Sequence, residues 1–236
     1  MPECVSTSAS HDPFTFRRPK LFSHKAGRQV AVSLARNDEA EGDPTPCILK
    51  FFSPKCRTAF ERELSIYNCE EIEESRPQKL WSGTWASSKY SEFIGNLPSI
   101  LRKSDSLVYI LVLSYVEGFE AFIPSQPIEL QKHAVKAALL SLQKFHSAGI
   151  IHGDVSVDNL LLQNNGDRLE AIWIDFSSSI VNASTAMARH EWEQTVTYFS
   201  DLVNQLKELA DHDQDSCRTF SDSSSRSTSN LSLRFY

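Results

Sequence analysis

The chain has 236 residues, a hydrophobic content of 41% and a formal net charge of -6. This length suits one or two domains, and the composition is sufficient for an ordinary packed core. The acidic balance argues against a nucleic acid or an anionic membrane surface as the main partner. The longest apolar run, residues 107–113, has the length of a strand and is far too short to span a bilayer.

Cysteine usage and the N-terminal residues both bear on the compartment. The 5 cysteines form no C-x-x-C pair, so neither structural disulfides nor a cysteine zinc site is expected. Residues 1–20 contain no apolar segment of signal-peptide length. The sequence therefore predicts a soluble, monomeric, intracellular protein of the cytoplasm, with the nucleus left open.

The first half of the chain is predicted to consist mainly of strands. Apolar residues alternate with small or polar ones over residues 30–34, which is typical of a half-buried strand. The loop-forming residues 37–46 separate it from a second strand, with which we expect it to form a hairpin. The expected elements are strands at 30–34, Cys47–Phe52, Lys79–Trp85 and Leu107–Val116, and a helix at Arg57–Asn68.

Helices are predicted to dominate the second half. Residues Pro127–Ser147 carry the helical period, and Gly149 stands where a left-handed cap residue belongs. Ala171–Phe176 is expected as a short buried strand, and Ser216–Ser232 as a disordered serine-rich segment. A further amphipathic helix is expected over His190–Ala210, with Trp192, Phe199, Val203, Leu206 and Leu209 toward the core.

A lysine and a glutamate are predicted to form a buried ion pair. Glu63 lies on the apolar stripe formed by Phe60, Leu64 and Tyr67, where a charge is costly unless a partner neutralises it. Lys50 interrupts the apolar strand CILKFF and would serve as that partner. The alternative is that the lysine extends to water and the glutamate is solvated at the edge of the stripe. A paired lysine in a cleft would be a fixed cation, suited to nucleotide phosphates.

Two carboxylates and an amide follow in the second half. In the segment IIHGDVSVDNLL, Asp154 precedes Asn159 by five positions (159 − 154), the layout H-x-D-x-x-x-x-N of a kinase catalytic loop. A carboxylate at this place accepts the proton of an attacking hydroxyl, and the amide oxygen helps to hold Mg²⁺. Asp175 ends the apolar strand IWID, where a hard oxygen ligand suits the same ion. His152 is expected to fix the backbone of the loop.

With these motifs in this order, the chain resembles the protein-kinase-like superfamily over residues 21–210. It is most similar to small, divergent fungal-type members with H-G-D in the catalytic loop. The resemblance implies an α+β, two-lobed fold with a small β-rich N-lobe and a shortened, mainly helical C-lobe. It is carried by ILK (Ile48–Lys50), FERELSIY (Phe60–Tyr67), LVLSYVEG (Leu111–Gly118), LQKFHSAGIIHGD (Leu142–Asp154) and WIDFS (Trp173–Ser177).

The resemblance also implies boundaries and roles. The N-lobe would span residues 21–113, the hinge 114–118 and the C-lobe 119–210, after a polar extension (1–20) and before a disordered tail (211–236). ATP and Mg²⁺ would be the cofactors. The Ser114 carbonyl and the Val116 amide would hold the adenine edge above Leu161, Lys50 would grip phosphates and Glu63 would orient it. Asp154 would be the base, and Asn159 and Asp175 would hold magnesium.

Several departures from the family pattern affect function. The segment Ser23–Val32 contains a single glycine, Gly27, where a glycine-rich phosphate loop is usual. Ser156 replaces the catalytic-loop lysine, and Ser177 replaces the glycine of D-F-G. No A-P-E motif follows, so Asn182–Arg189 would serve as a shortened activation loop.

The sequence thus predicts an ATP-dependent phosphotransferase acting on a protein Ser/Thr hydroxyl, and leaves two alternatives. One is a pseudokinase, a binding module without turnover, which the departures favour. The other is a kinase of a small hydroxylated molecule, because H-G-D also occurs in kinases of aminoglycosides and choline. The chain retains all five residues that the resemblance assigns to phosphate binding, magnesium binding and proton transfer, and this favours the enzyme. They are Lys50, Glu63, Asp154, Asn159 and Asp175.

Overall fold

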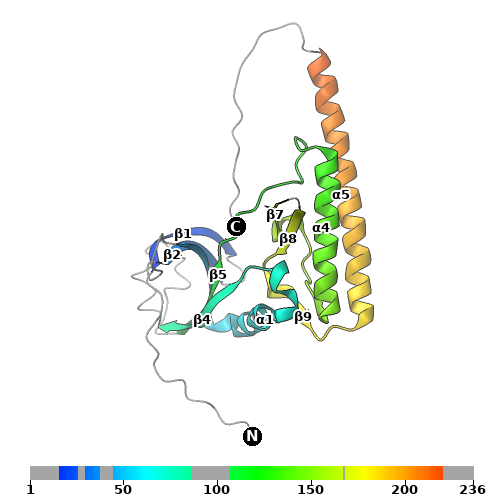
Figure 1. Cartoon of the computed structure of the whole chain (residues 1–236). Helices are drawn as coiled ribbons and strands as arrows, with labels where there is room; N and C mark the ends of the chain where they lie inside the picture. The colour runs from blue at the N-terminus through cyan, green and yellow to red at the C-terminus, as the bar shows by residue number, and fades with distance from the viewer. Residues whose placement is uncertain (1–15, 26–29, 38–44, 87–106, 167, 220–236) are drawn as a thin grey trace.

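A five-stranded antiparallel sheet forms the first half of the computed structural model, which describes residues 16–25, 30–37, 45–86, 107–166 and 168–219 (Figure 1). The strands lie in the order β1-β2-β3-β5-β4. Their bounds are β1 Phe16–Lys25, β2 Val30–Asn37, β3 Thr45–Phe52, β4 Lys79–Ala86 and β5 Leu107–Ser114. The predicted hairpin is confirmed, because β2 and β3 pair antiparallel with Val32 opposite Lys50.

Helix α1, Arg57–Tyr67, follows β3 after a single 3-10 turn at Pro54–Cys56. Phe60, Glu63, Ile66 and Tyr67 form its buried face, as the helical period predicts. Phe60 packs edge-on against Phe52 of β3, with ring centroids 5.6 Å apart, and this contact fixes the helix to the sheet. A second 3-10 segment, Glu70–Ser75, leads back to β4.

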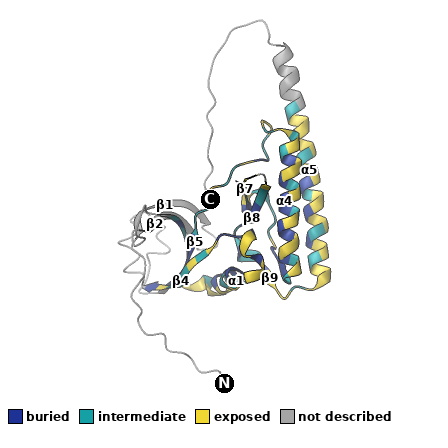
Figure 2. Ribbon diagram, viewed as in Figure 1, coloured by how far each residue is buried: buried dark blue, intermediate teal, exposed yellow. Residues whose placement is uncertain are grey.

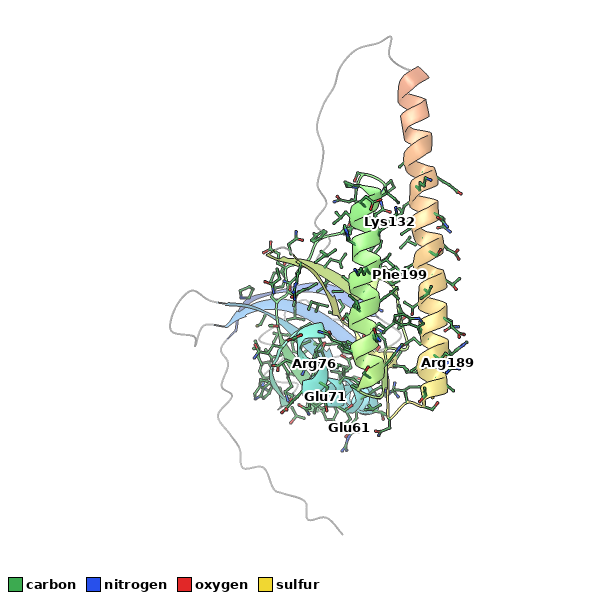
Figure 3. All side chains as sticks on the ribbon, turned by 45° about the vertical axis from the view of Figure 1, so that its right-hand side comes forward. Glu61, Glu71, Arg76, Lys132, Arg189 and Phe199 are labelled. Carbon is green, nitrogen blue, oxygen red and sulfur yellow. The ribbon has the colours of Figure 1, made fainter. Side chains whose placement is uncertain are left out.

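Two long helices form the second half. α4, Ile128–Ser147, ends as predicted before Gly149, whose φ of 70° is readily adopted only by glycine. α5, Thr185–Thr219, packs beside α4 and continues past it (Figure 1). Phe199 lies on the α4 side of α5 and is fully buried (Figure 3).

Short strands between these helices carry the polar loops. β6, Ile150–Ile151, pairs with β9, Ile180–Val181. β7, Leu160–Asn165, pairs with β8, Arg168–Trp173, so that Leu160 lies opposite Trp173. Trp173, Phe176 and Phe145 are fully buried where α4 covers this hairpin, while the outer faces of α4 and α5 are exposed (Figure 2). The expected α+β fold with two lobes is confirmed.

Several boundaries differ from the predictions. β1 begins at Phe16, inside the segment expected as a polar extension. α5 begins at Thr185, so most of the segment expected as a shortened activation loop is helix. It also includes 211–219, which were expected to belong to the disordered tail 211–236, and the rest of that tail lies outside the described residues. Leu209 is 54% exposed, so its expected place in the core is wrong.

No helix in the described part of the chain combines the length and the apolar character needed to cross a membrane.

Candidate functional site

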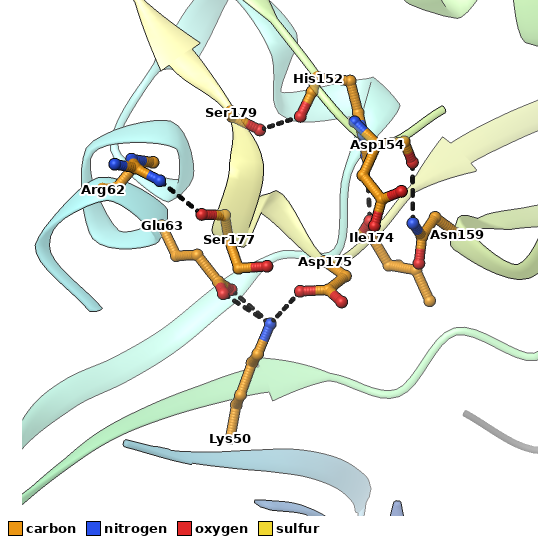
Figure 4. Close-up of polar contacts among 10 residues, drawn as sticks. All are labelled: Lys50, Arg62, Glu63, His152, Asp154, Asn159, Ile174, Asp175, Ser177 and Ser179. Carbon is orange, nitrogen blue, oxygen red and sulfur yellow. Dashed lines mark hydrogen bonds and ion pairs between the residues drawn. The ribbon is translucent and has the colours of Figure 1, made fainter. Parts of the chain in front are cut away.

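The ammonium group of Lys50 lies at the centre of a buried ionic cluster between the sheet and the helical half (Figure 4). Its Nζ donates to Glu63 Oε1 at 2.6 Å and Oε2 at 2.8 Å, and to Asp175 Oδ1 at 2.8 Å. The lysine comes from β3, the glutamate from α1 and the aspartate from the turn after β8. The predicted ion pair is therefore present, and it is extended by a second carboxylate.

Charge balance inside the cluster explains why these groups remain ionised. Lys50 is 6% exposed and Glu63 is fully buried. Burial alone lowers the pKa of Lys50, but the charges of Glu63 and Asp175 outweigh it, so its pKa lies above the ordinary value of 10.5. The lysine is consequently a permanent, rigidly held cation at neutral pH. Its position facing both lobes suits an anionic ligand such as a polyphosphate.

The loop after β6 carries Asp154 and Asn159. Asn159 Nδ2 donates to the Asp154 carbonyl at 2.8 Å, and this bond holds the two ends of the loop together. The Asn159 carbonyl in turn accepts the Ile174 N–H at 3.0 Å, directly before Asp175. The structure thus brings the expected loop residues and the expected metal ligand into one neighbourhood (Figure 4).

The donor set fits Mg²⁺ bound together with phosphate. Because the Asn159 amide nitrogen is bonded to the loop carbonyl, its oxygen is oriented away from that bond and offers a neutral ligand. Asp175 supplies a carboxylate beside it, and Mg²⁺ is commonly held by only one or two protein oxygens plus substrate phosphates and water. Within the described residues, no group of three or more His, Cys, Asp or Glu forms a metal site independent of a ligand.

Asp175 differs in one respect from the prediction. It was expected at the end of a strand spanning Ala171–Phe176, but β8 ends at Trp173. Asp175 has φ 60° and ψ 68°, the left-handed region, and precedes a 3-10 turn at Phe176–Ser178. This backbone conformation is unfavourable for most residues and is tolerated by aspartate. The turn directs the carboxylate toward Lys50 (Figure 4).

His152 acts as a backbone clamp, as the sequence predicted. Its Nε2 donates to the Ile174 carbonyl at 3.0 Å, and its Nδ1 accepts the Asp154 N–H at 3.3 Å. One donor and one acceptor define the neutral imidazole. Burial lowers the pKa of His152 below its ordinary value of 6.5, and nearby acidic groups only partly counter this effect. The histidine is thus neutral at pH 7 and joins the loop to the segment leading into Asp175.

Gly153 has a steric reason to be glycine. Its φ is 77°, and a Cβ at this position would lie 2.3 Å from the Ser178 carbonyl oxygen. The backbones of the catalytic loop and of the turn 176–178 are therefore in direct contact. Ser179 adds a hydrogen bond from its Oγ to the His152 carbonyl at 2.8 Å. The glycine in H-G-D is thus dictated by packing.

The expected hinge residues follow β5. Ser114 ends β5, and its N–H donates to the Gln78 carbonyl at 2.8 Å. Val116 is partly buried in the connection to the helical half. Leu161 on β7 lies against that connection, because a Cβ on Gly118 would be 3.1 Å from the Leu161 Cβ. The three residues expected around an adenine are thus gathered where the two lobes join.

The departures have structural counterparts. Gly27 lies outside the described residues. Ser156, in place of a lysine, precedes the 3-10 turn Val157–Asn159, and its carbonyl accepts the Asn159 N–H at 3.2 Å. The carbonyl of Ser177 accepts a hydrogen bond from Arg62 Nη1 at 2.6 Å, which ties the turn after Asp175 to α1.

Sequence reasoning missed Glu191. This residue of α5 is 8% exposed, and its Oε1 accepts the Gly153 N–H at 2.6 Å. Its Oε2 accepts the His152 N–H at 3.0 Å and contacts His146 Nε2 at 2.8 Å. Burial alone raises the pKa of the Glu191 carboxyl, but these donors more than offset it, so the pKa lies below its ordinary value. A negative charge thus anchors the catalytic loop on α5.

Tyr198, one further position of α5, supports the other end of the loop by accepting the Val157 N–H at 3.2 Å. Glu191 and Tyr198 are seven residues apart (198 − 191), two turns along the same face of the helix. The available sequence signal was the one used for Glu63: a charge beside apolar residues at helical spacing.

Comparisons with known proteins identify a matching family and two relatives. A family model described as the lipopolysaccharide kinase (Kdo/WaaP) family matches residues 117–209, which include α4, the short strands after it and most of α5. The chain is 33% identical over 93 residues to the probable serine/threonine-protein kinase 2 of Plasmodium falciparum (isolate K1 / Thailand). It is 26% identical over 155 residues to the KEOPS complex subunit Bud32 of Pyrococcus abyssi (strain GE5 / Orsay).

The matches cover limited shares of each protein. The first relative is matched over 37% of this chain and 18% of its own length, the second over 64% of each. The chain thus spans less than two thirds of the length of either relative. The family model and the first relative are both described as kinases. The buried lysine–glutamate pair and the H-x-D-x-x-x-x-N loop described above follow the layout of a kinase site. Together the matched family and the two relatives support a divergent protein-kinase-like domain in this chain.

Proposed function

We propose that the chain is an ATP-dependent phosphotransferase that transfers the γ-phosphoryl group of ATP to a hydroxyl group. The observation that carries this proposal is the buried cluster of Lys50, Glu63 and Asp175. A buried cation shared by two carboxylates from separate elements is expensive to build for stability alone, because each ion loses its hydration. Its position beside the loop of Asp154 and Asn159 is what phosphoryl transfer requires.

Each residue has a role that follows from its environment. Lys50 would bind nucleotide phosphates as a fixed cation, with Glu63 holding its position. Asn159 and Asp175 would hold Mg²⁺, whose bound charge would neutralise the phosphate oxygens. Asp154 would orient the acceptor hydroxyl and take its proton. The hinge at Ser114 and Val116, with Leu161 on the other side, would receive the adenine, as the kinase resemblance implies.

For the acceptor we propose a serine or threonine hydroxyl of a polypeptide. A small hydroxylated molecule is the alternative, since the matched family model describes kinases of a lipopolysaccharide. A binding module without turnover is a second candidate, favoured by Ser156 in the catalytic loop and by the short segment between Asp175 and α5.

The test compares two aspartates of the same loop. Asp154→Asn should lower the rate of phosphate transfer by about 10²–10⁴-fold, the usual contribution of a general base, with ATP affinity unchanged within a few fold. Asp158→Asn is the matched control, because Asp158 is exposed and outside the cluster. Rates are measured as ADP formation with ATP and Mg²⁺. If the wild type and Asp154→Asn consume ATP equally, the binding module replaces the enzyme.

A further inference from the structure

A cavity of about 310 Å³ lies between the catalytic loop and α5. Ile151, Gly153 and Val155 line it from the loop, while Met187 and Tyr198 are among the residues that line it from the helix. Its volume is near the lower end of the ~300–1,000 Å³ range of small-ligand pockets, so it suits one or two amino-acid side chains. Gly153 and Val155 flank Asp154 in sequence and line the cavity, whereas Asp154 does not, so the candidate base is one residue away from the cavity wall.

The walls of this cavity are largely apolar. Ile151, Val155 and Met187 contribute hydrocarbon and thioether surface, and Met187 is 39% exposed at the cavity. Methionine adapts its shape to different apolar partners, which makes it common at binding surfaces. The cavity is therefore expected to take an aliphatic side chain that accompanies an acceptor hydroxyl.

The chain itself contains such a sequence after α5. Residues 220–236 lie outside the described residues, and among them Ser232 is flanked by Leu231 and Leu233. This is a hydroxyl group between two aliphatic side chains, the combination that the cavity and the base would accept.

Chain length decides whether this serine can reach the loop. Glu191 bonds the N–H of Gly153, beside Asp154, and Thr219 ends α5 28 residues further on (219 − 191), a distance of about 42 Å at 1.5 Å per residue. Ser232 is 13 residues beyond Thr219 (232 − 219), and 13 extended residues span at most about 43 Å. Ser224 is only 5 residues beyond Thr219 (224 − 219) and spans at most about 17 Å. The distal serine can therefore return to the cavity, whereas the proximal serines cannot.

We propose that Ser232 is an intramolecular phosphate acceptor, docked by a neighbouring leucine in the cavity between the catalytic loop and α5. The proposal rests on the function proposed above. Ser232 Oγ would attack the γ-phosphorus of ATP and form the new P–O bond as the bond to the β,γ-bridging oxygen breaks. The hydroxyl proton would pass to the Asp154 carboxylate, and ADP would leave with the bridging oxygen. The products are phosphoserine and ADP.

Phosphopeptide mapping of the full chain after incubation with ATP and Mg²⁺ tests the chemistry. Phosphate is expected on Ser232 and not on Ser221–Ser225, and Ser232→Ala should remove it. Because the reaction is intramolecular, the rate per molecule should stay constant when the protein is diluted a hundredfold. Phosphate confined to the proximal serines, or a rate per molecule that rises with protein concentration, overturns this proposal and leaves the proposed phosphotransferase standing.

Two exposed apolar residues of α5 give a matched pair of variants. Met187 lines the cavity, and Val196, which is 41% exposed, is nine residues further, on the opposite side of the helix at 3.6 residues per turn. Met187→Glu should lower the rate of Ser232 phosphorylation at least about tenfold, or about 1.4 kcal/mol. Val196→Glu should change it less than about twofold. Equal effects of the two variants contradict the docking.

A measurement without nucleotide separates docking from chemistry. Benzoylphenylalanine in place of Leu233, irradiated in the full chain, is expected to crosslink within one molecule to the loop 151–155 or to 187–198 of α5. Crosslinks elsewhere overturn the docked tail whatever the ATP measurements show. Crosslinks at the cavity without ATP consumption would support the docking of the tail. The same result would refute both the proposed enzyme activity and the phosphorylation of Ser232.

Discussion

Replacing Glu191 with alanine removes an acceptor that serves two backbone N–H groups of the catalytic loop. These are the N–H groups of His152 and Gly153, at 3.0 Å and 2.6 Å from the carboxylate oxygens. A buried donor left without a partner costs about 1–3 kcal/mol, so two cost about 2–6 kcal/mol of unfolding free energy. For a chain of this size each kcal/mol lowers the melting temperature by about 2–4 °C. We therefore expect a fall of about 4–24 °C.

The assay is urea unfolding combined with thermal melting, with two comparison variants. Glu191→Gln retains one acceptor oxygen and should give an intermediate loss. Glu193→Ala, an exposed residue on the same helix, should change the unfolding free energy by less than about 0.5 kcal/mol. If Glu191→Ala is as mild as Glu193→Ala, the carboxylate does not anchor the loop and the reasoning from these contacts is refuted.

Two other predictions concern the charges of the site. Lys50→Met should cost about 3–5 kcal/mol of unfolding free energy, because it takes the lysine away from the fully buried Glu63 carboxylate. Glu63→Gln should cost less, because Lys50 keeps its ion pair with Asp175. The double variant should lose at least about 1 kcal/mol less than the sum, and strict additivity in urea unfolding would contradict the pairing. The second prediction concerns the pH dependence of stability. In the folded chain the pKa of His152 lies below its ordinary value of 6.5. Between the folded pKa and 6.5, the unfolded chain therefore binds more protons than the folded chain. The contribution of neutral His152 to the unfolding free energy is therefore complete above pH 6.5 and declines as the pH falls toward the folded pKa. His152→Gln should flatten the pH dependence of the unfolding free energy in this range. An unchanged slope would contradict the depressed pKa of His152.

The Lys50–Glu63 pair was predictable because each charge interrupts an apolar pattern, and burying an unpaired charge costs much free energy. Glu63 interrupts an apolar stripe, and so does Lys50 on its strand, so each position demanded a partner of opposite charge. The end of α4 was equally predictable, since Gly149 supplies the left-handed cap. At these two positions the neighbouring residues alone were sufficient to predict the local structure.

Other features depend on contacts between distant segments, which a single sequence does not reveal. Helical spacing places Glu191 beside apolar residues, but Glu193 follows two positions later, and only the packing of residues 152–153 against α5 shows which carboxylate accepts their N–H groups. The left-handed backbone of Asp175 is set by the Lys50 contact and by the turn that follows, so the strand pattern IWIDF extended the predicted strand too far. Leu209 fits the helical stripe but lies where α5 has passed beyond its neighbours, and is exposed.

The close approach of Gly153 to Ser178 has a mechanical consequence. There is no room for a side chain between the two backbones, so the loop that carries Asp154 and the turn that follows Asp175 pack directly against each other. We therefore expect a displacement of that turn to move the loop as well, so that Asp154 and Asp175 shift together. We expect conformational control of this site to move both segments at once, through the hydrogen bonds that join them to Arg62 of α1 and Glu191 of α5.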